Sequence, residues 1–320
     1  MKSTTDKAIS RPAEGINTGN IINVCYSSDQ NYAKYMALSM ATVLNTKAPD
    51  DNIHFYILDG GISDKDKQKI LNLKRIAPCE ITFITVDKEK FKNFPLEHTK
   101  SLTLSTYYRL LLPDFLPHVD KVIYFDCDIE ARGSLKDLYN TEISLYPLAM
   151  AEDIDADFHC KRLNLNSYYN AGMLLLNLQK LREEKFTEKL FDFIEENSEK
   201  LYQHDQDVLN LYFKNQIKEL DPKWNYNKHF THTSSFMKKV KTAQVIHYLG
   251  GKWGFILMNC PLFLKTGYKL EFTKLYIKSV IKFIVSQIFQ VRNADNRTQK
   301  EITILGFTFY INKKLKAKEE

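Results

Sequence analysis

A pair of aspartates, one residue apart, follows a short apolar run near the middle of the chain. The run Lys121–Phe125 predicts a buried strand, and Asp126 and Asp128 come directly after it. Alternate residues of an extended chain face the same side, so the two carboxylates can converge on one point. Carboxylates that close repel each other and stay ionised only beside a compensating charge. Because Mg²⁺ and Mn²⁺ take oxygen ligands and keep positions open for substrate phosphates, the pair predicts a divalent metal site.

Two other interpretations of this pair have to be weighed. Solvated aspartates of an ordinary loop show the same spacing. A hydrophobic strand that ends in such a pair also resembles the start of haloacid-dehalogenase-type phosphatases, in which the first aspartate is a nucleophile. Those phosphatases have Thr or Val after the second aspartate and carry the motif near the start of the domain. Here Ile129-Glu130 follows, and three strand–helix units come first, so the metal site is favoured.

A histidine and a glycine-rich turn occur near residue 250. His247 ends the apolar run 243–248, and Gly250, Gly251 and Lys252 follow it. Glycines let the backbone approach a ligand closely, and a lysine binds phosphate as a point charge. A lone histidine is more often a structural group than a ligand. An imidazole together with two carboxylates is nevertheless a suitable ligand set for Mn²⁺.

Three polar residues stand at the expected start of a short helix over 205–213. They are Asp205, Gln206 and Asp207. A helix cap explains one acid at this position but not all three residues. A cap and a functional site therefore both remain open for this segment.

Small residues precede a further apolar strand. Asn170-Ala171-Gly172 leads into an expected strand over 173–176. The pattern is typical of a tight turn, or of a ligand that lies close to the backbone.

Strand and helix patterns alternate through the first part of the chain. This alternation, at intervals of roughly 30 residues, predicts a parallel sheet covered by helices. Open sheets of this kind bind ligands outside the carboxyl ends of their strands, and the aspartate pair lies at the end of the fourth, central strand. Strands are expected over 21–26, 53–58, 80–86 and 121–125, and helices over 31–44, over 63–75 with Ser63 as N-cap, and over 105–112, ending before Pro113.

The pattern is less regular after residue 130, and the end of the chain is basic. Lys274, Lys278 and Lys282 form one stripe of an expected amphipathic helix over 272–291. The other expected elements are strands over 148–151, 173–176, 243–248 and 302–311, a charged amphipathic helix within 178–201 and the short helix over 205–213.

The composition limits the class of protein. The chain has 320 residues, of which 44% are hydrophobic and 26% charged, and this suits one large domain with an appendage. The net charge is +6, but residues 261–320 alone hold twelve basic and five acidic side chains, so the rest is near neutral. A basic tail favours an anionic partner surface, either phospholipid or nucleic acid. Nucleic acid is disfavoured because the rest of the chain has no basic face.

Cysteines and hydropathy indicate the compartment. Five widely spaced cysteines without a CxxC motif indicate free thiols in a reducing compartment and argue against structural zinc. Residues 1–20 are polar and do not read as a secretory signal, and no apolar stretch is long enough to span a membrane. We therefore expect a cytoplasmic protein.

Taken together, these segments resemble glycosyltransferase family 8, which includes bacterial lipopolysaccharide α-galactosyl- and α-glucosyltransferases. The resemblance extends from Ile21 to Trp253 in the family's order. It implies an α/β protein with a GT-A fold, in which a Rossmann-like mixed or parallel sheet flanked by helices binds a nucleotide sugar. The expected units are a flexible leader (1–19), the GT-A domain (20–260) and a basic amphipathic C-terminal extension (261–320). The matching segments are YSSDQNYAKY (26–35), HFYILDGGIS (54–63), STYYRLLLPDFLP (105–117), KVIYFDCDIEARGSL (121–135), YYNAGMLLLNL (168–178), HDQDVLN (204–210) and HYLGGKW (247–253).

The resemblance also implies a role for individual residues. Gly251 stands where family members commonly have a Pro-containing loop, so the expected position of Lys252 is less well defined than that of His247. The implied metal ligands are Asp126, Asp128 and His247; the implied donor-binding residues are Asp29, Asn31, Tyr32, Arg109, Asn170, Ala171, Gly172, Asp205, Gly250 and Lys252; Asp153 would face the acceptor; and Gln206, with Asp207, would be catalytic.

The implied reaction moves galactose or glucose from a UDP-hexose, with Mn²⁺ or Mg²⁺, to a lipid-linked lipopolysaccharide or lipooligosaccharide core, with retention of configuration. Retention normally indicates a carboxylate nucleophile, but Gln206 is an amide, which favours attack from the front face and leaves Asp207 as an alternative nucleophile. The basic extension would hold the enzyme on the inner face of the cytoplasmic membrane. A UDP-sugar-binding protein without turnover is the non-enzymatic alternative.

Overall fold

The computed structural model describes residues 21–91, 94, 104–227 and 242–249, together with the backbone of 289–293, 299–304 and 307–312. The expectations for residues 1–19, for Gly250 and Lys252 and for residues 261–288 lie outside these ranges. In the described part of the chain, no helix is both long and apolar enough to cross a membrane.

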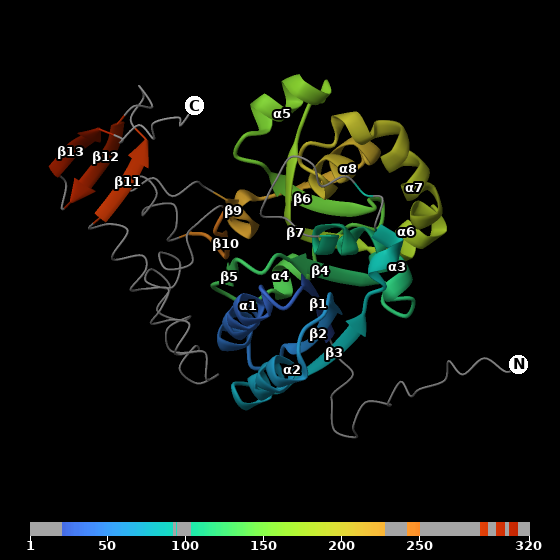
Figure 1. Cartoon of the computed structure of the whole chain (residues 1–320). Coiled ribbons are helices and arrows are strands. Elements are labelled where there is room, and N and C mark those ends of the chain that lie inside the picture. The colour runs from blue at the N-terminus through green and yellow to red at the C-terminus, as the bar shows by residue number, and fades with distance from the viewer. Residues whose placement is uncertain are drawn as a thin grey trace, which may run out of the picture.

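A mixed seven-stranded sheet forms the centre of the molecule (Figure 1). Its strands are β1 (Ile21–Ser28), β2 (Asn52–Asp59), β3 (Cys79–Thr85), β4 (Lys121–Phe125), β6 (Leu148–Glu152), β7 (Tyr169–Asn177) and β8 (Ile217–Leu220). The order β3-β2-β1-β4-β7-β6-β8 makes β4 the middle strand. The first four strands run parallel, and β7 is antiparallel to both β4 and β6. The predicted α/β sheet with a central fourth strand is therefore confirmed.

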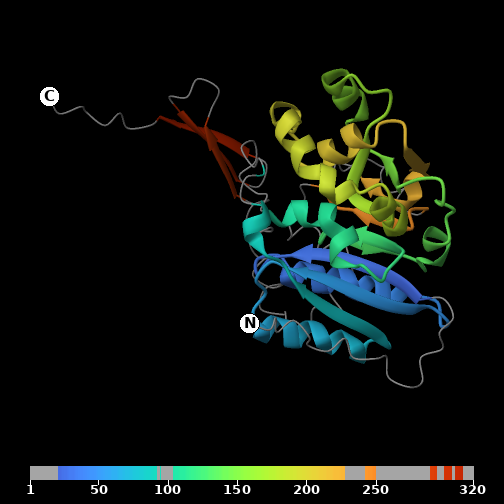
Figure 2. The ribbon, with the colours of Figure 1, turned by 90° about the vertical axis from the view of Figure 1, so that its right-hand side faces the viewer.

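Helices cover both faces of this sheet, because successive strand residues point to opposite sides. Val24 of β1 belongs to one apolar core and its neighbour Cys25 to the other. Figure 2 shows α2 on one side of β1 to β3 and the turns of η3 and α3 on the other. The first core packs against α1 (Ala33–Thr46), α2 (Asp64–Leu71) and α4 (Lys136–Tyr139), and the second against η3 (Leu104–Leu111), α3 (Leu112–Phe115), α6 (Leu178–Glu183), α7 (Phe186–Asn197) and α8 (Asp205–Tyr212).

Side-chain hydrogen bonds to the backbone fix the chain where the first two helices begin. Asp29 Oδ1 accepts hydrogen bonds from the backbone N–H of Asn31 (2.8 Å) and Tyr32 (3.1 Å) at the entry to α1. Ser63 caps α2, as predicted, and its hydroxyl accepts from the N–H of Asp66 at 3.4 Å. Both loops follow the carboxyl end of a parallel strand, so these hydrogen bonds also fix the backbone at the edge where ligands are expected.

A second, smaller sheet crosses the end of β4. It consists of β5 (Ile129–Ala131), β10 (Val245–His247) and β9 (Tyr226–Asn227). The antiparallel register of β10 and β5 pairs His247 with Ile129. Because β5 starts directly after the aspartate pair, this pairing brings a residue about 120 positions away in sequence to the metal-binding motif.

The helical predictions were less accurate than the strand predictions. The helix expected over 105–112 is the 3₁₀ helix η3 (Leu104–Leu111), and its expected end before Pro113 is wrong. The chain continues into α3, where Pro113 lies in the first turn and its missing N–H costs nothing. The expected helix within 178–201 is divided into α6, α7 and the 3₁₀ turn η4 (Ser198–Lys200). The expected helix over 63–75 is divided into α2 and the 3₁₀ turn η1 (Asn72–Arg75). The sequence patterns also missed α5 (Ala156–Leu163), η2 (Lys88–Phe91), η5 (Pro222–Trp224), α4, β5, β8 and β9.

The C-terminal extension contains strands where one helix and one strand were predicted. The helix expected over 272–291 is wrong at its end, because Phe289–Asn293 forms β11. The strand expected over 302–311 is two strands, β12 (Gln299–Ile304) and β13 (Phe307–Asn312). The three strands form an antiparallel sheet in the order β11-β12-β13.

Candidate metal and nucleotide-sugar site

The aspartate pair and His247 lie together beyond the end of β4. One potential ligand atom of each residue lies within 4.8 Å of the other two. His247 Nε2 is 3.2 Å from Asp128 Oδ1 and 3.9 Å from Asp126 Oδ2. An imidazole nitrogen with two carboxylate oxygens is a donor set that suits Mn²⁺. The side chains converge as the sequence predicted, while their role as metal ligands stays a prediction.

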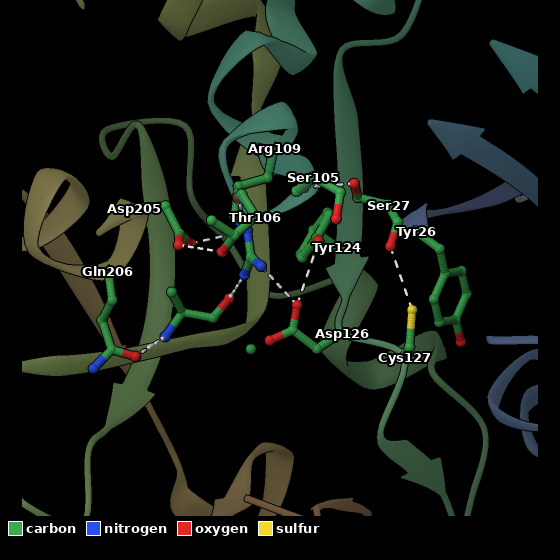
Figure 3. Close-up of polar contacts among 12 residues, drawn as sticks. Tyr26, Ser27, Ser105, Thr106, Arg109, Tyr124, Asp126, Cys127, Asp205 and Gln206 are labelled. Carbon is green, nitrogen blue, oxygen red and sulfur yellow. Dashed lines mark hydrogen bonds and ion pairs between the residues drawn. The ribbon is translucent and has the colours of Figure 1, made fainter. Parts of the chain in front are cut away.

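The backbone around the pair is a tight turn and not a continuation of the strand. Asp126 donates its N–H to the Gly172 carbonyl at 2.8 Å, and Tyr248 donates its N–H to the Asp128 carbonyl at 3.1 Å. These bonds attach the turn to β7 on one side and to β10 on the other. Cys127, between the acids, points inward and its thiol donates to the Ser27 carbonyl at 3.3 Å (Figure 3).

Two neighbours fix the His247 ring: Asn170 sets its orientation, and Gly172 leaves room for it. Nδ1 lies 3.0 Å from Asn170 Oδ1, and this contact makes Nδ1 the protonated nitrogen and leaves Nε2 to the acids. The ring occupies the space where a side chain at position 172 would stand, so only glycine fits there. Burial lowers the pKa of His247, but the charges of Asp128 and Asp126 outweigh burial and raise that pKa above its ordinary value. A proton and a cation thus compete for the same nitrogen.

A buried arginine connects the metal-binding motif to the first turn of α8. The Arg109 guanidinium donates to Asp126 Oδ1 at 2.7 Å and pairs with Asp205 Oδ2 at 3.0 Å (Figure 3). It also donates to the Ala171 carbonyl at 2.5 Å and lies over the Tyr124 ring, 4.3 Å from its centroid. Burial raises the pKa of Asp126, and the Arg109 charge opposes that rise. Arg109 therefore holds one Asp126 oxygen, and the other remains directed toward His247.

Asp205, the first residue of α8, is bound on two sides. Besides Arg109, the Thr106 hydroxyl donates to its carboxylate. Burial raises the pKa of Asp205 to about 6, with the Arg109 charge acting in the opposite direction. Helix η3, which precedes β4, and helix α8, which follows β7, thus meet at the buried ion pair between Arg109 and Asp205.

Gln206 binds the N–H of Ala171, whose carbonyl is bound by Arg109. Its Oε1 accepts from the Ala171 N–H at 2.9 Å and from Asn170 Nδ2 at 3.2 Å. Its Nε2 donates to Asp153 Oδ2 at 3.3 Å and to the Tyr168 hydroxyl at 3.2 Å. The predicted acceptor residue Asp153 and the predicted catalytic residue Gln206 are therefore in contact.

Asn170 connects the catalytic and metal-binding groups. Its Nδ2 donates to Asp153 at 2.8 Å, while its Oδ1 faces His247 and accepts from Asn225 Nδ2 at 2.9 Å. Asn225 is a buried residue that the sequence patterns missed, since no motif surrounds it. Only the fold, which places η5 beside β10, reveals it.

Asp207 is fully buried, and its hydrogen-bond partners are groups other than the predicted metal ligands. Its Oδ1 accepts from Arg162 Nη2 and from the Tyr168 hydroxyl, both at 2.6 Å, and its Oδ2 accepts from the Gln203 N–H at 2.8 Å. Both carboxylate oxygens are thus already used within the protein.

The predicted nucleoside-binding residues lie at the end of β1. Asn31 and Tyr32 are exposed and Asp29 is half-buried. Burial raises the pKa of Tyr32, and the negative charge of Asp128 raises it further, which places this phenol near the metal-binding motif. The loop after β2 lies beside this segment, because Gly60 donates its N–H to the Ser28 carbonyl at 2.9 Å.

Comparison with known proteins supports this picture. The profile of the family described as Glycosyl transferase family 8 matches residues 23–253. A putative glycosyltransferase of Haemophilus influenzae is 34% identical over 72% of this chain and 71% of its own length. A lipopolysaccharide 1,2-glucosyltransferase of Escherichia coli is 33% identical over 68% of this chain and 65% of its own length. The galactosyltransferase LgtC, solved with donor and acceptor sugar analogues, superposes with a TM-score of 0.63 at 28% identity, over 72% of this chain and 88% of LgtC.

The fold and the site define a GT-A type α/β glycosyltransferase. The chain belongs to glycosyltransferase family 8.

Proposed function

We propose that this enzyme transfers galactose or glucose from a UDP-hexose to a lipopolysaccharide or lipooligosaccharide core, with retention of configuration and with Mn²⁺ as cofactor. The observation that carries the proposal is the convergence of Asp126, Asp128 and His247 within 4.8 Å at the carboxyl end of the central strand. The name of the E. coli lipopolysaccharide 1,2-glucosyltransferase supports the acceptor class, and because LgtC is named a galactosyltransferase, both hexoses stay open.

In this proposal the three converging residues hold the cation, which serves as Lewis acid for the diphosphate. Asp29, Asn31 and Tyr32 bind the nucleoside from the end of β1. Arg109 and Asp205 lie where the donor sugar meets the metal, together with the backbone of 170–172. Gly250 and Lys252 are proposed for the diphosphate from the sequence alone. Asp153, beside Gln206, is the proposed acceptor contact.

The surroundings of Gln206 and Asp207 support attack from the front face. A nucleophile needs a free oxygen directed at the anomeric carbon, and both oxygens of Asp207 accept hydrogen bonds within the protein. Gln206 Oε1 lies beside the Ala171 N–H, near the proposed donor position, but an amide is a weak nucleophile. Its role here is to stabilise positive charge at the sugar while the leaving diphosphate accepts the acceptor's proton. Isolation of a glycosyl adduct on Asp207 of the unmodified enzyme would contradict this mechanism.

A panel of UDP-sugars tests the function. The enzyme is incubated with each donor, Mn²⁺ and truncated lipooligosaccharides, and released UDP is measured. UDP-galactose or UDP-glucose is expected to give acceptor-dependent release above a slow hydrolysis. UDP binding without any turnover would favour the binding protein, and hydrolysis of phosphomonoesters would favour the phosphatase interpretation.

We also propose that the extension 261–320 attaches the enzyme to the inner face of the cytoplasmic membrane, where lipid-linked acceptors are made. Its basic composition is the main support. The strand register adds a second observation, because it pairs apolar residues with one another, Val291 with Ile302 and Ile302 with Phe309. Interleaved apolar and basic residues are typical of segments that lie in a membrane interface.

Co-sedimentation with liposomes tests this attachment. The full chain is expected to sediment with vesicles that contain anionic lipid, and less so as salt increases, because surface charges are screened. A chain ending at Cys260, and the triple variant Lys274→Glu, Lys278→Glu, Lys282→Glu, should remain in the supernatant. Equal sedimentation of all three proteins would refute the proposal.

A further inference from the structure

A chain of buried polar contacts connects helix α5 with Gln206. Arg162, in α5, donates to Asp207 Oδ1 at 2.6 Å. The Tyr168 hydroxyl donates to the same oxygen at 2.6 Å and accepts from Gln206 Nε2 at 3.2 Å. The other Asp207 oxygen is held by the Gln203 N–H. A fully buried carboxylate needs such partners, so Arg162 and Tyr168 stabilise Asp207 in this place.

The direction of these hydrogen bonds determines the orientation of the Gln206 amide, together with the Asp153 carboxylate, which also accepts from Gln206 Nε2 at 3.3 Å. A tyrosine hydroxyl has one proton, and Tyr168 gives it to Asp207, since a carboxylate can only accept. Toward Gln206 the hydroxyl can therefore only accept, and the amide must present its NH₂ group. The Gln206 oxygen then points the opposite way, to the Ala171 N–H at 2.9 Å. The network thus distinguishes two amide orientations that are otherwise nearly alike in shape.

A histidine supports the two donors of this network. The His159 ring stacks on Tyr168 with 4.4 Å between the ring centroids. Its Nδ1 faces Arg162 Nη2 at 3.1 Å and serves as acceptor for the guanidinium. Arg162 also donates to the Lys200 carbonyl at 2.8 Å, so that α5 is tied to the turn before α8.

We propose that Arg162 and Tyr168 are positioning residues for the transfer reaction. They keep Asp207 as the acceptor of the Tyr168 proton, and Tyr168 in turn keeps the Gln206 oxygen on the side of Ala171 and the proposed donor position. This inference rests on the proposed function, in which Gln206 stabilises charge at the donor sugar. It gives Asp207 a role that does not require attack on the sugar.

Removal of a single hydroxyl tests the proposal. In Tyr168→Phe the Gln206 NH₂ group loses one acceptor, and the two amide orientations become closer in free energy. We expect kcat for UDP-hexose turnover to fall about tenfold, the effect of one lost hydrogen bond in the transition state, while KM for the donor and Mn²⁺-dependent UDP affinity stay within about twofold. Tyr169→Phe is the matched control, because Tyr169 packs in a different apolar cluster from Tyr168 and none of the hydrogen bonds of the network uses its hydroxyl. It should behave as the unmodified enzyme.

The arginine is tested by a charge series. Arg162→Lys keeps a cation that can pair with Asp207, and Arg162→Met removes it. We expect kcat to decrease in the order of the unmodified enzyme, Arg162→Lys and Arg162→Met, again with little change in KM. Arg182→Met, which removes a different ion pair with Asp120, should leave kcat unchanged.

Three results would overturn the inference. Unchanged kcat in both Tyr168→Phe and Arg162→Met, with only a lower melting temperature, would show that the network merely holds α5 against α8. Equal losses of UDP binding and kcat would show that the site as a whole had collapsed. No turnover of any UDP-hexose by the unmodified chain would instead refute the proposed function, and the inference with it.

Discussion

The substitution Gly172→Ala is expected to abolish most metal-dependent activity, although it adds only one methyl group and changes no charge. A Cβ atom at position 172 would lie 2.5 Å from Nδ1 and 2.8 Å from Nε2 of His247, and nearer still to Cε1. The ring cannot stay where it is, and it is buried between Asn170 and the aspartate pair. A displaced imidazole loses both its orienting hydrogen bond and its approach to Asp128.

Changes to the groups that orient a metal ligand typically cost 10- to 100-fold in metal affinity. Because the Gly172 methyl moves the ligand itself, we expect a loss of about a hundredfold or more in Mn²⁺-dependent UDP affinity, measured by titration calorimetry. Overpacking also costs stability, in the range of about 1–3 kcal/mol, which a melting curve reports.

Gly133→Ala is the matched control for this steric argument. A Cβ atom there would overlap Oε1 of Gln244 and lie 3.4 Å from its Cδ. Gln244 has a flexible, half-buried side chain that can rotate away, in contrast to a wedged imidazole. Gly133→Ala should therefore bind Mn²⁺ and UDP as the unmodified protein does. Equal affinity in both variants would contradict the assignment of His247 to the metal.

The second large effect is expected for Asp128→Ala. Asp128 supplies the oxygen nearest to His247 Nε2, at 3.2 Å. Its removal leaves one carboxylate, and Asp126 shares one of its oxygens with Arg109. We expect UDP release from UDP-hexose to fall roughly a thousandfold or more, a loss comparable with removal of a principal electrostatic group of an active site.

Two further variants accompany Asp128→Ala: one tests the role of the charge, and the other is a control for folding. Asp128→Asn keeps the shape of the side chain and should also lose Mn²⁺-dependent binding, because a neutral amide replaces an ionic ligand. Asp192→Ala changes an exposed aspartate on α7 and should leave both binding and turnover intact. Full activity of Asp128→Ala would refute the metal site.

Hydrophobic periodicity was sufficient to predict the half of the sheet, β1 to β4, that positions Asp126 and Asp128. The strands that became β1, β2 and β4 are mainly apolar runs, and the one that became β3 alternates apolar and polar residues. Helical patterns separate them, and their parallel direction follows from that succession of strands and helices. The direction of β7 could not be predicted, because an apolar run has no polarity of its own. Its antiparallel pairing with β4 places residues 170–172 beside the aspartates.

Contacts between distant segments were harder to predict. The spacing of Asp126 and Asp128 indicated their convergence, and His247 was found through its glycine-rich surroundings. Arg162 and Asn225 carry no local signal, and Tyr168 opens the matching segment 168–178 without a role being assigned to it there. Each of the three is selected by a buried partner that comes from another element. The extension shows a different failure, because apolar residues at helical spacing near residue 289 also alternate, and cross-strand pairing decides between the two structures.

The central claim is that Asp126, Asp128 and His247 bind the cation on which UDP-hexose turnover depends. The most direct measurement is UDP release by the full chain after treatment with a chelator, followed by stepwise addition of Mn²⁺. We expect no acceptor-dependent release in the chelator and a saturable return of activity with Mn²⁺ in the unmodified chain, but no return in Asp128→Ala. Undiminished release in the presence of the chelator, or the same return in both proteins, would contradict the account.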